Sequence, residues 1–167
     1  RDHCVTGVQT CALPIFLFSY MFDFNSTAIR KNPMGVLEAF QRAFPLPGLQ
    51  AVLGKTYNNH ELSTHVALLI KTFPPMSDCA EWQWLQMRAK EDPRIHFIVA
   101  SLERDELLEL YGSCDVFLSL HRSEGYGRGI AEALQLGLDV IASDYGGNTD
   151  FCDGPLAHLV QIGRAHV

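Results

Sequence analysis

The sequence has no hydrophobic run that could form a transmembrane helix, and it has few basic residues. No stretch of about 18 consecutive apolar residues occurs among its 167 residues, so a membrane-spanning helix is not expected. Lys and Arg number 13 against 19 Asp and Glu, which gives a formal net charge of −6. Nonspecific binding to nucleic acid or to anionic membranes needs a basic surface, so the charge balance argues against both. A local phosphate site stays possible.

Cysteine pairs with redox or metal-binding spacing are also absent. The five cysteines, an odd number, form no C-x-x-C pair, and no His/Cys cluster has the spacing of metal ligands, so we expect no metal site. With 47% hydrophobic residues the chain can bury a core without a disulfide scaffold. Reduced thiols in a cytoplasmic protein are the simplest interpretation.

The two ends of the chain share an unusual relationship. The codons ATC GGA AGA GCA CAC GTC encode Ile-Gly-Arg-Ala-His-Val at 162–167. Their reverse complement, read from its second base, encodes Thr-Cys-Ala-Leu-Pro and the start of an Ile codon, which matches Thr-Cys-Ala-Leu-Pro-Ile at 10–15. This DNA segment resembles a common sequencing adapter. We therefore expect 1–15 and 162–167 to be translated adapter rather than native protein, and 16–161 to be a native piece of a longer gene.

Between the ends, short apolar runs alternate with amphipathic segments. The runs predict buried strands at Phe16–Phe22, Val66–Ile70, Ile95–Val99, Val116–Leu120 and Val140–Ser143, with a truncated sixth at Leu156–Val160. Helices are predicted from Pro33 towards Phe44, from Ser77 or Asp78 to about Glu91, at Glu103–Tyr111 and at Arg128–Gln135. This alternation predicts one α/β domain with a doubly wound, Rossmann-like parallel sheet. Ligands of such sheets bind beyond the carboxyl ends of the strands, near the switch in strand order.

A glycine-rich turn follows the predicted strand at 116–120 and opens the next helix. Gly125, Gly127 and Gly129 alternate with Tyr126 and Arg128, which lets the backbone approach a ligand closely. Free amides at the start of a helix favour an anion there. The spacing is not G-x-G-x-x-G, so the dinucleotide fingerprint is not met, and simple turn geometry remains an alternative.

Two acidic residues make the turn more informative. Glu124 lies in it, and Glu132 lies eight residues later, off the stripe predicted to be buried by Ile130, Ala133 and Leu134. Carboxylates at these places could accept hydrogen bonds from the hydroxyls of a sugar and of a ribose. The alternatives are a solvated loop acid for Glu124 and, for Glu132, an acid favoured by the helix dipole.

The order of these residues resembles the E-x7-E signature of retaining GT-B glycosyltransferases. Glu-Gly-Tyr-Gly at 124–127 is followed by Glu132-Ala133. Other segments also look like parts of that family: Arg30-Lys31-Asn32-Pro33 before a helix containing Glu38-Ala39-Phe40, Cys114–Ser119, Leu138–Ser143 and Gly146–Asp150. The resemblance covers nearly all of Phe16 to Val160. It implies the nucleotide-sugar-binding, C-terminal half of a GT-B fold.

The resemblance implies a role for each matching residue. Glu124 would contact the hydroxyls of the transferred sugar, and the amides of 125–127 would approach the sugar and the diphosphate. Glu132 would hold the ribose hydroxyls. Lys31 matches the basic residue that neutralises the leaving diphosphate, so Lys31 and Glu124 would be the catalytic residues. A solvated lysine at a helix start is the alternative for Lys31.

The sequence departs from the family pattern at the end of the first strand. The family often has Gly-Arg there, whereas this chain has Ser19 to Asp23, so one diphosphate-binding arginine is missing. Lys71, after the second strand, could supply the charge or could be a surface lysine. Arg128 replaces a commonly apolar position and could also face phosphate. We expect His121 and Arg122 to shape the loop rather than to act in catalysis.

These observations predict a domain that binds a nucleoside-diphosphate sugar and transfers the sugar to an acceptor hydroxyl with retained configuration. The acceptor, a saccharide or another hydroxyl compound, would lie on an N-terminal domain that this chain lacks. The isolated chain should therefore bind donor weakly and turn over little. The family usually needs no metal, and no cofactor is expected because the nucleotide sugar is a substrate.

Two other functions fit the same residues. A GT-B-like nucleotide-sugar epimerase would share this architecture but would need catalytic acids from the other lobe. A non-catalytic nucleotide-sugar-binding domain would keep the fold with degenerate catalysis, although the presence of Glu124, Glu132 and Lys31 argues against degeneracy.

Overall fold

The computed structural model describes residues 15–25, 28–46, 65–76 and 80–162. Almost all of the two ends that are expected to be translated adapter, 1–15 and 162–167, lies outside these residues. The segment 47–64 lies outside them as well. Within the described part, no helix is long and apolar enough to cross a membrane.

Six parallel strands form one sheet in the order β3-β2-β1-β4-β5-β6. The strands are β1 (Phe16–Phe22), β2 (Val66–Thr72), β3 (Ile95–Val99), β4 (Val116–Ser119), β5 (Asp139–Ser143) and β6 (Ala157–Val160). The predicted doubly wound parallel sheet is confirmed. The chain winds outward from β1 to β3, returns to pair β4 with β1, and then continues outward to β6.

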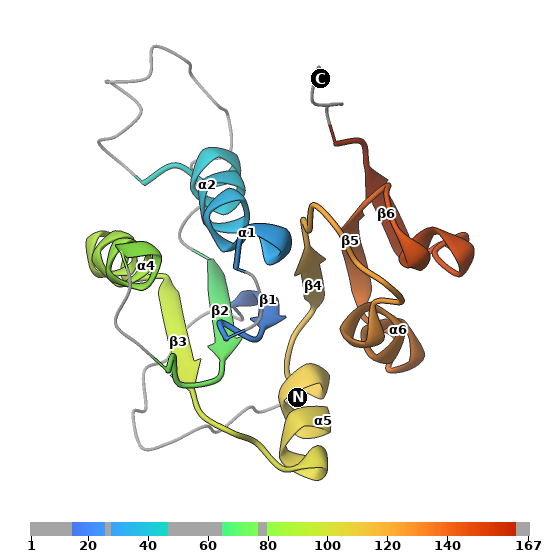
Figure 1. Ribbon diagram of the computed structural model, residues 1–167, viewed down its shortest axis with the longest axis horizontal. Coiled ribbons are helices and arrows are strands. Elements are labelled where there is room, and N and C mark those ends of the chain that lie inside the picture. The colour runs from blue at the N-terminus through green and yellow to red at the C-terminus, as the bar shows by residue number, and fades with distance from the viewer. Residues whose placement is uncertain (1–14, 26–27, 47–64, 77–79, 163–167) are drawn as a thin grey trace.

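Helices connect the strands and cover both faces of the sheet (Figure 1). They are α1 (Ala28–Lys31), α2 (Pro33–Ala43), α4 (Ala80–Glu91), α5 (Arg104–Gly112) and α6 (Arg128–Gln135), with the 3-10 helix η2 (Gly147–Asp150). The short helix α1 was not predicted, because four residues are too few to show a helical pattern in sequence. Residues 77–79, the predicted start of α4, lie outside the described part.

The core has two layers because successive side chains of a strand point to opposite faces. From β1, Phe18, Tyr20 and Phe22 enter the layer that contains α2 and α4. Leu17 and Met21 pack against the layer that contains α5 and α6. The helices supply Val36, Leu37, Phe40, Trp82 and Leu85 to the first layer, and Tyr111, Ile130 and Ala133 to the second. Burial on both faces explains the apolar runs of the inner strands β1, β2 and β4, whereas the edge strand β6 is mostly exposed.

The topology places the switch in strand order between β1 and β4. The segment after β1 leads to α1, and the segment after β4 leads to α6. Both leave the carboxyl edge of the sheet at this switch, which is where open α/β sheets bind their ligands.

Candidate functional site

The loop between β4 and α6 makes the turn that the glycines predicted. Gly127 is the N-cap residue of α6 and has a φ of 88°, a left-handed conformation that favours glycine. A Cβ at this position would also come within 3.1 Å of Ile130 Cδ1 and 3.4 Å of Asn148 Cβ. The backbone is therefore closely packed on its inner side, while Tyr126 is 59% exposed.

Helix α1 is tied to this loop although about 90 residues separate them in sequence. The Arg122 amide donates to the Arg30 carbonyl oxygen (2.8 Å), and the Arg30 guanidinium donates to the Ser123 carbonyl oxygen (3.2 Å). Asn32, in a left-handed conformation, donates from Nδ2 to the Leu120 carbonyl oxygen (2.8 Å). These bonds fix the segment after β1 against the segment after β4.

Two cations converge on Glu124 at this junction. Lys31 Nζ donates a hydrogen bond to Glu124 Oε2, and Arg30 Nη1 lies 3.5 Å from Oε1. Burial raises the pKa of the Glu124 carboxyl, but the hydrogen bond from Lys31 and the charges of Lys31 and Arg30 lower it by more. Glu124 is therefore ionised, and a pair of positive charges lies beside the glycine loop.

The inner side of the loop rests on buried polar groups. Ser143 Oγ donates to the His121 carbonyl oxygen (2.6 Å), and Asn148 Nδ2 donates to the Ser143 carbonyl oxygen (2.9 Å). Burial lowers the pKa of His121, which favours the neutral ring. The Gly147 amide adds a hydrogen bond to the Glu124 carbonyl oxygen (3.1 Å). These contacts anchor the β4–α6 loop to the end of β5 and to η2. The role of the His121 side chain stays a prediction.

Glu132 lies on α6, away from its buried residues Ile130 and Ala133. Its Oε1 accepts a hydrogen bond from Arg104 Nη1 on α5 (2.6 Å), and 23% of its side chain is exposed. Sequence reasoning did not identify Arg104. The only feature of the sequence that sets Arg104 apart is that it is a basic residue at the start of an otherwise acidic helix.

In the described part of the chain, neither of the remaining candidates, Lys71 and Arg128, forms an ion pair with Glu124. Lys71 is the second-to-last residue of β2, and its Nζ lies 3.8 Å from the Phe73 ring centroid. Burial lowers the pKa of Lys71, and the charge of Asp23 opposes this shift. In the described part of the chain, Lys71 is not among the charges that shift the pKa of Glu124. Arg128 is the exposed first residue of α6.

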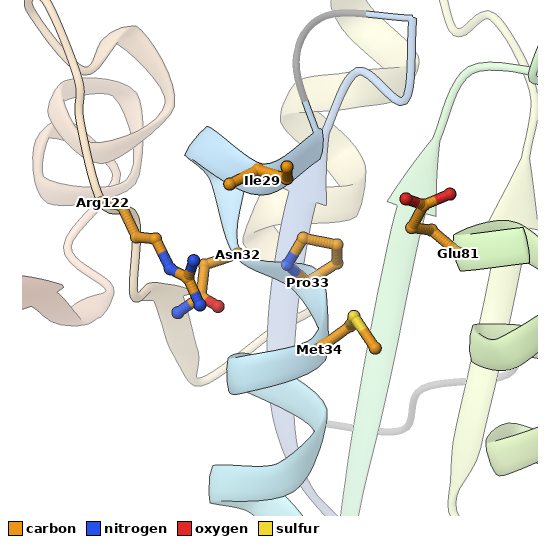
Figure 2. Close-up of a pocket in the computed structure, with 6 residues that line it drawn as sticks. All are labelled: Ile29, Asn32, Pro33, Met34, Glu81 and Arg122. Atoms are coloured by element: carbon orange, nitrogen blue, oxygen red, sulfur yellow. The ribbon is translucent and has the colours of Figure 1, made fainter.

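Figure 2 shows a small apolar hollow beside α1, lined by Ile29, Asn32, Pro33, Met34, Glu81 and Arg122. Its volume is about 90 Å³. Pockets for small-molecule ligands usually have volumes of about 300–1,000 Å³, so this hollow is too small for a nucleotide. Among the described residues, no group of three or more His, Cys, Asp or Glu side chains is arranged to hold a metal ion.

With this geometry established, the chain can be compared with known proteins. Residues 85–153 match the family model of the glycosyl transferases group 1. The match runs from within α4 to just beyond η2 and includes Glu124, the glycine loop and Glu132. Over this segment it confirms the predicted resemblance to glycosyltransferases. Lys31 and Arg30 lie outside the matched segment. No curated protein sequence matches the chain significantly.

Solved GT-B glycosyltransferases share the fold of this chain. A UDP-forming α,α-trehalose-phosphate synthase from Burkholderia xenovorans matches 88% of this chain with a TM-score of 0.67 and 17% identity. Anabaena HepE, solved in complex with UDP-glucose, matches 89% with a TM-score of 0.66 and 16% identity. The matched region covers 33% of the first protein and 35% of the second, so this chain spans about a third of their length.

Proposed function

We propose that this chain is the donor-binding, C-terminal domain of a retaining GT-B glycosyltransferase. The observation that carries the proposal is the convergence of Lys31 and Arg30 on Glu124, beside the glycine loop and at the switch in strand order. Phosphates need cations or amide donors to offset their charge, and this junction provides both. The complex of HepE with UDP-glucose supports a nucleotide sugar as the ligand.

In this proposal, the cations, the backbone amides and the acidic residues each contribute to donor binding. The Lys31 ammonium and the Arg30 guanidinium offset the charge of the diphosphate, with the amides of Gly125–Gly127 as further donors. Arg30 takes the place of the arginine that the sequence lacks after β1. Lys71 and Arg128 remain additional candidates for phosphate contacts. Glu132 accepts hydrogen bonds from the ribose hydroxyls.

The Lys31–Glu124 ion pair suggests how donor binding prepares the reaction. In the structure, the Glu124 carboxylate forms ion pairs with both Lys31 and Arg30. A diphosphate that binds these cations releases Glu124 to accept hydrogen bonds from the sugar hydroxyls. As the bond between sugar and diphosphate breaks, negative charge develops on the leaving group, and the fixed cations stabilise it. The acceptor hydroxyl then takes the sugar from its binding site on the other lobe.

A ligand screen tests the proposal directly. The chain is titrated with UDP, ADP, GDP and UDP-glucose by calorimetry or by NMR chemical shifts. We expect one nucleoside diphosphate to bind, and we expect shifts at Lys31, Gly125–Gly127 and Glu132. Absence of binding by every nucleotide, or shifts confined to another edge of the sheet, would contradict the proposal.

Replacing Glu132 with alanine should weaken nucleotide binding more than it disturbs folding. Its side chain fills no core position and alanine is the better helix former, so the melting temperature should change little. Loss of a charged acceptor for two ribose hydroxyls should cost roughly 1.5–3 kcal/mol of binding free energy. Thermal melting without ligand and calorimetric affinity for the nucleotide measure the two effects.

Glu38→Ala is the matched control, because Glu38 is also a helical acid in an exposed ion pair, with Arg42. It should leave nucleotide affinity unchanged. A large drop in melting temperature with unchanged affinity would make Glu132 a structural residue.

A further inference from the structure

Arg104 on α5 forms an ion pair with Glu132 on α6, the residue proposed to bind the ribose. It is the first residue of α5, and its Nη1 lies 2.6 Å from Glu132 Oε1 on α6, 28 residues further along the chain. The side chain of Arg104 is 58% exposed. The contact therefore joins two helices near the carboxyl edge of the sheet, on the solvent side.

Stability does not account for this ion pair. A cation in the first turn of a helix is opposed by the helix dipole. The start of α5 is already capped, because Glu103 and Glu106 form a reciprocal capping box. Exposed ion pairs contribute little to folding free energy. Arg104 thus occupies an unfavourable place on its own helix and gains little stability from its contact with Glu132.

Helices α5 and α6 also pack against each other in the core. Tyr111 of α5 is 2% exposed, and its hydroxyl oxygen would lie 3.1 Å from a Cβ on Gly129 of α6. Burial raises the pKa of Tyr111, and the nearby charge of Glu132 raises it further. The two helices therefore meet at Gly129, towards the end of α5 opposite to Arg104.

We propose that Arg104 is a positioning residue that orients the Glu132 carboxylate towards the ribose hydroxyls of the bound nucleotide. The inference rests on the function proposed above. A carboxylate has two oxygens, and Arg104 engages Oε1, which leaves Oε2 for the ligand. A glutamate held in one rotamer before binding loses less conformational entropy when the ribose arrives.

The test measures affinity for a nucleotide with and without its ribose hydroxyls. Wild-type chain, Arg104→Ala and Arg104→Lys are titrated with UDP and 2′,3′-dideoxy-UDP, or with the corresponding ADP or GDP pair if the screen selects another base. Arg104→Ala should weaken binding of the ribonucleotide by about 3- to 10-fold and leave binding of the dideoxy analogue unchanged. Arg104→Lys should restore part of the lost affinity. In a Glu132→Ala background, Arg104→Ala should have no further effect.

Arg42→Ala is the matched control, because it removes the same charge from an exposed ion pair with Glu38. Arg42→Ala should leave the affinities for the ribonucleotide and for the dideoxy analogue unchanged. Neither Arg42→Ala nor Arg104→Ala should shift the melting temperature appreciably. Equal weakening of both nucleotides by Arg104→Ala would indicate a phosphate contact and overturn the inference. Tighter ribonucleotide binding would show that Arg104 competes with the ribose, which would also overturn it.

The design separates the inference from the function on which it rests. If the wild-type chain binds no nucleoside diphosphate, the proposed function fails and the inference fails with it. If the wild-type chain binds and prefers the ribonucleotide but Arg104→Ala behaves like wild type, only the role of Arg104 is wrong.

Discussion

Replacing Lys31 with methionine should reduce the turnover of the complete enzyme by about 10²- to 10³-fold, the usual cost of removing one electrostatic stabiliser of a transition state. The methionine keeps the length of the side chain but removes its charge. Lys31 Nζ contacts Glu124 at the carboxyl edge of the sheet, where the diphosphate is expected. Arg30 remains beside Glu124, so this carboxylate keeps a cationic partner and the fold should persist. Steady-state kinetics with saturating donor and acceptor measure the loss.

Lys90→Met serves as the control for charge removal, because Lys90 is an exposed residue in the last turn of α4. Its turnover should match that of the wild type. The same substitution at Lys71 tests the competing assignment. If Lys71→Met abolishes turnover while Lys31→Met leaves it unchanged, the leaving diphosphate is stabilised at the end of β2 and the proposed site is misplaced.

The sheet could be predicted from sequence because its strands are buried on both faces. Runs such as Phe16–Phe22 and Val116–Leu120 are apolar except for one serine each, and that pattern indicates a parallel sheet between helices. The alternation of strands and helices along the chain then predicts a doubly wound sheet. The ends of elements depend on weaker local signals. β2 therefore continues through Lys71 and Thr72, beyond the apolar run that predicted it, while β4 ends at Ser119, one residue early.

The site could be predicted only in part. That Lys31 and Glu124 share one edge follows from topology, since both come directly after neighbouring strands. The ion pairs of Arg30 with Glu124 and of Arg104 with Glu132 do not follow from topology, because they depend on how the side chains are oriented. The Arg30 contact depends on how the four-residue helix α1 docks against the β4–α6 loop. The Arg104 contact depends on the rotation of α5 about its axis, which sequence periodicity fixes only roughly.

Gly147→Ala should both destabilise the chain and remove most of its nucleotide affinity. A Cβ on Gly147 would fall on the Gly125 carbonyl oxygen, 2.8 Å from the carbonyl carbon and 3.3 Å from Tyr126 Cα. These are backbone atoms, so no change of rotamer relieves the overlap. The loop after β5 and the glycine loop must separate, and the hydrogen bond from the Gly147 amide to the Glu124 carbonyl oxygen is lost. Overpacking of this kind costs about 1–3 kcal/mol, occasionally more.

Binding should weaken as well, because the displaced segment is the one that approaches the donor. A shift of about 1 Å in a positioning element can cost about 10²-fold, so we expect a loss of affinity near that size. Gly112→Ala is the control, since a Cβ at this helical position meets no atom within 4 Å and alanine favours the helix. It should raise the melting temperature slightly and leave affinity unchanged. Because Gly147 contacts the glycine loop only through its backbone, wild-type affinity in Gly147→Ala would mean that the position of residues 125–127 does not determine donor binding.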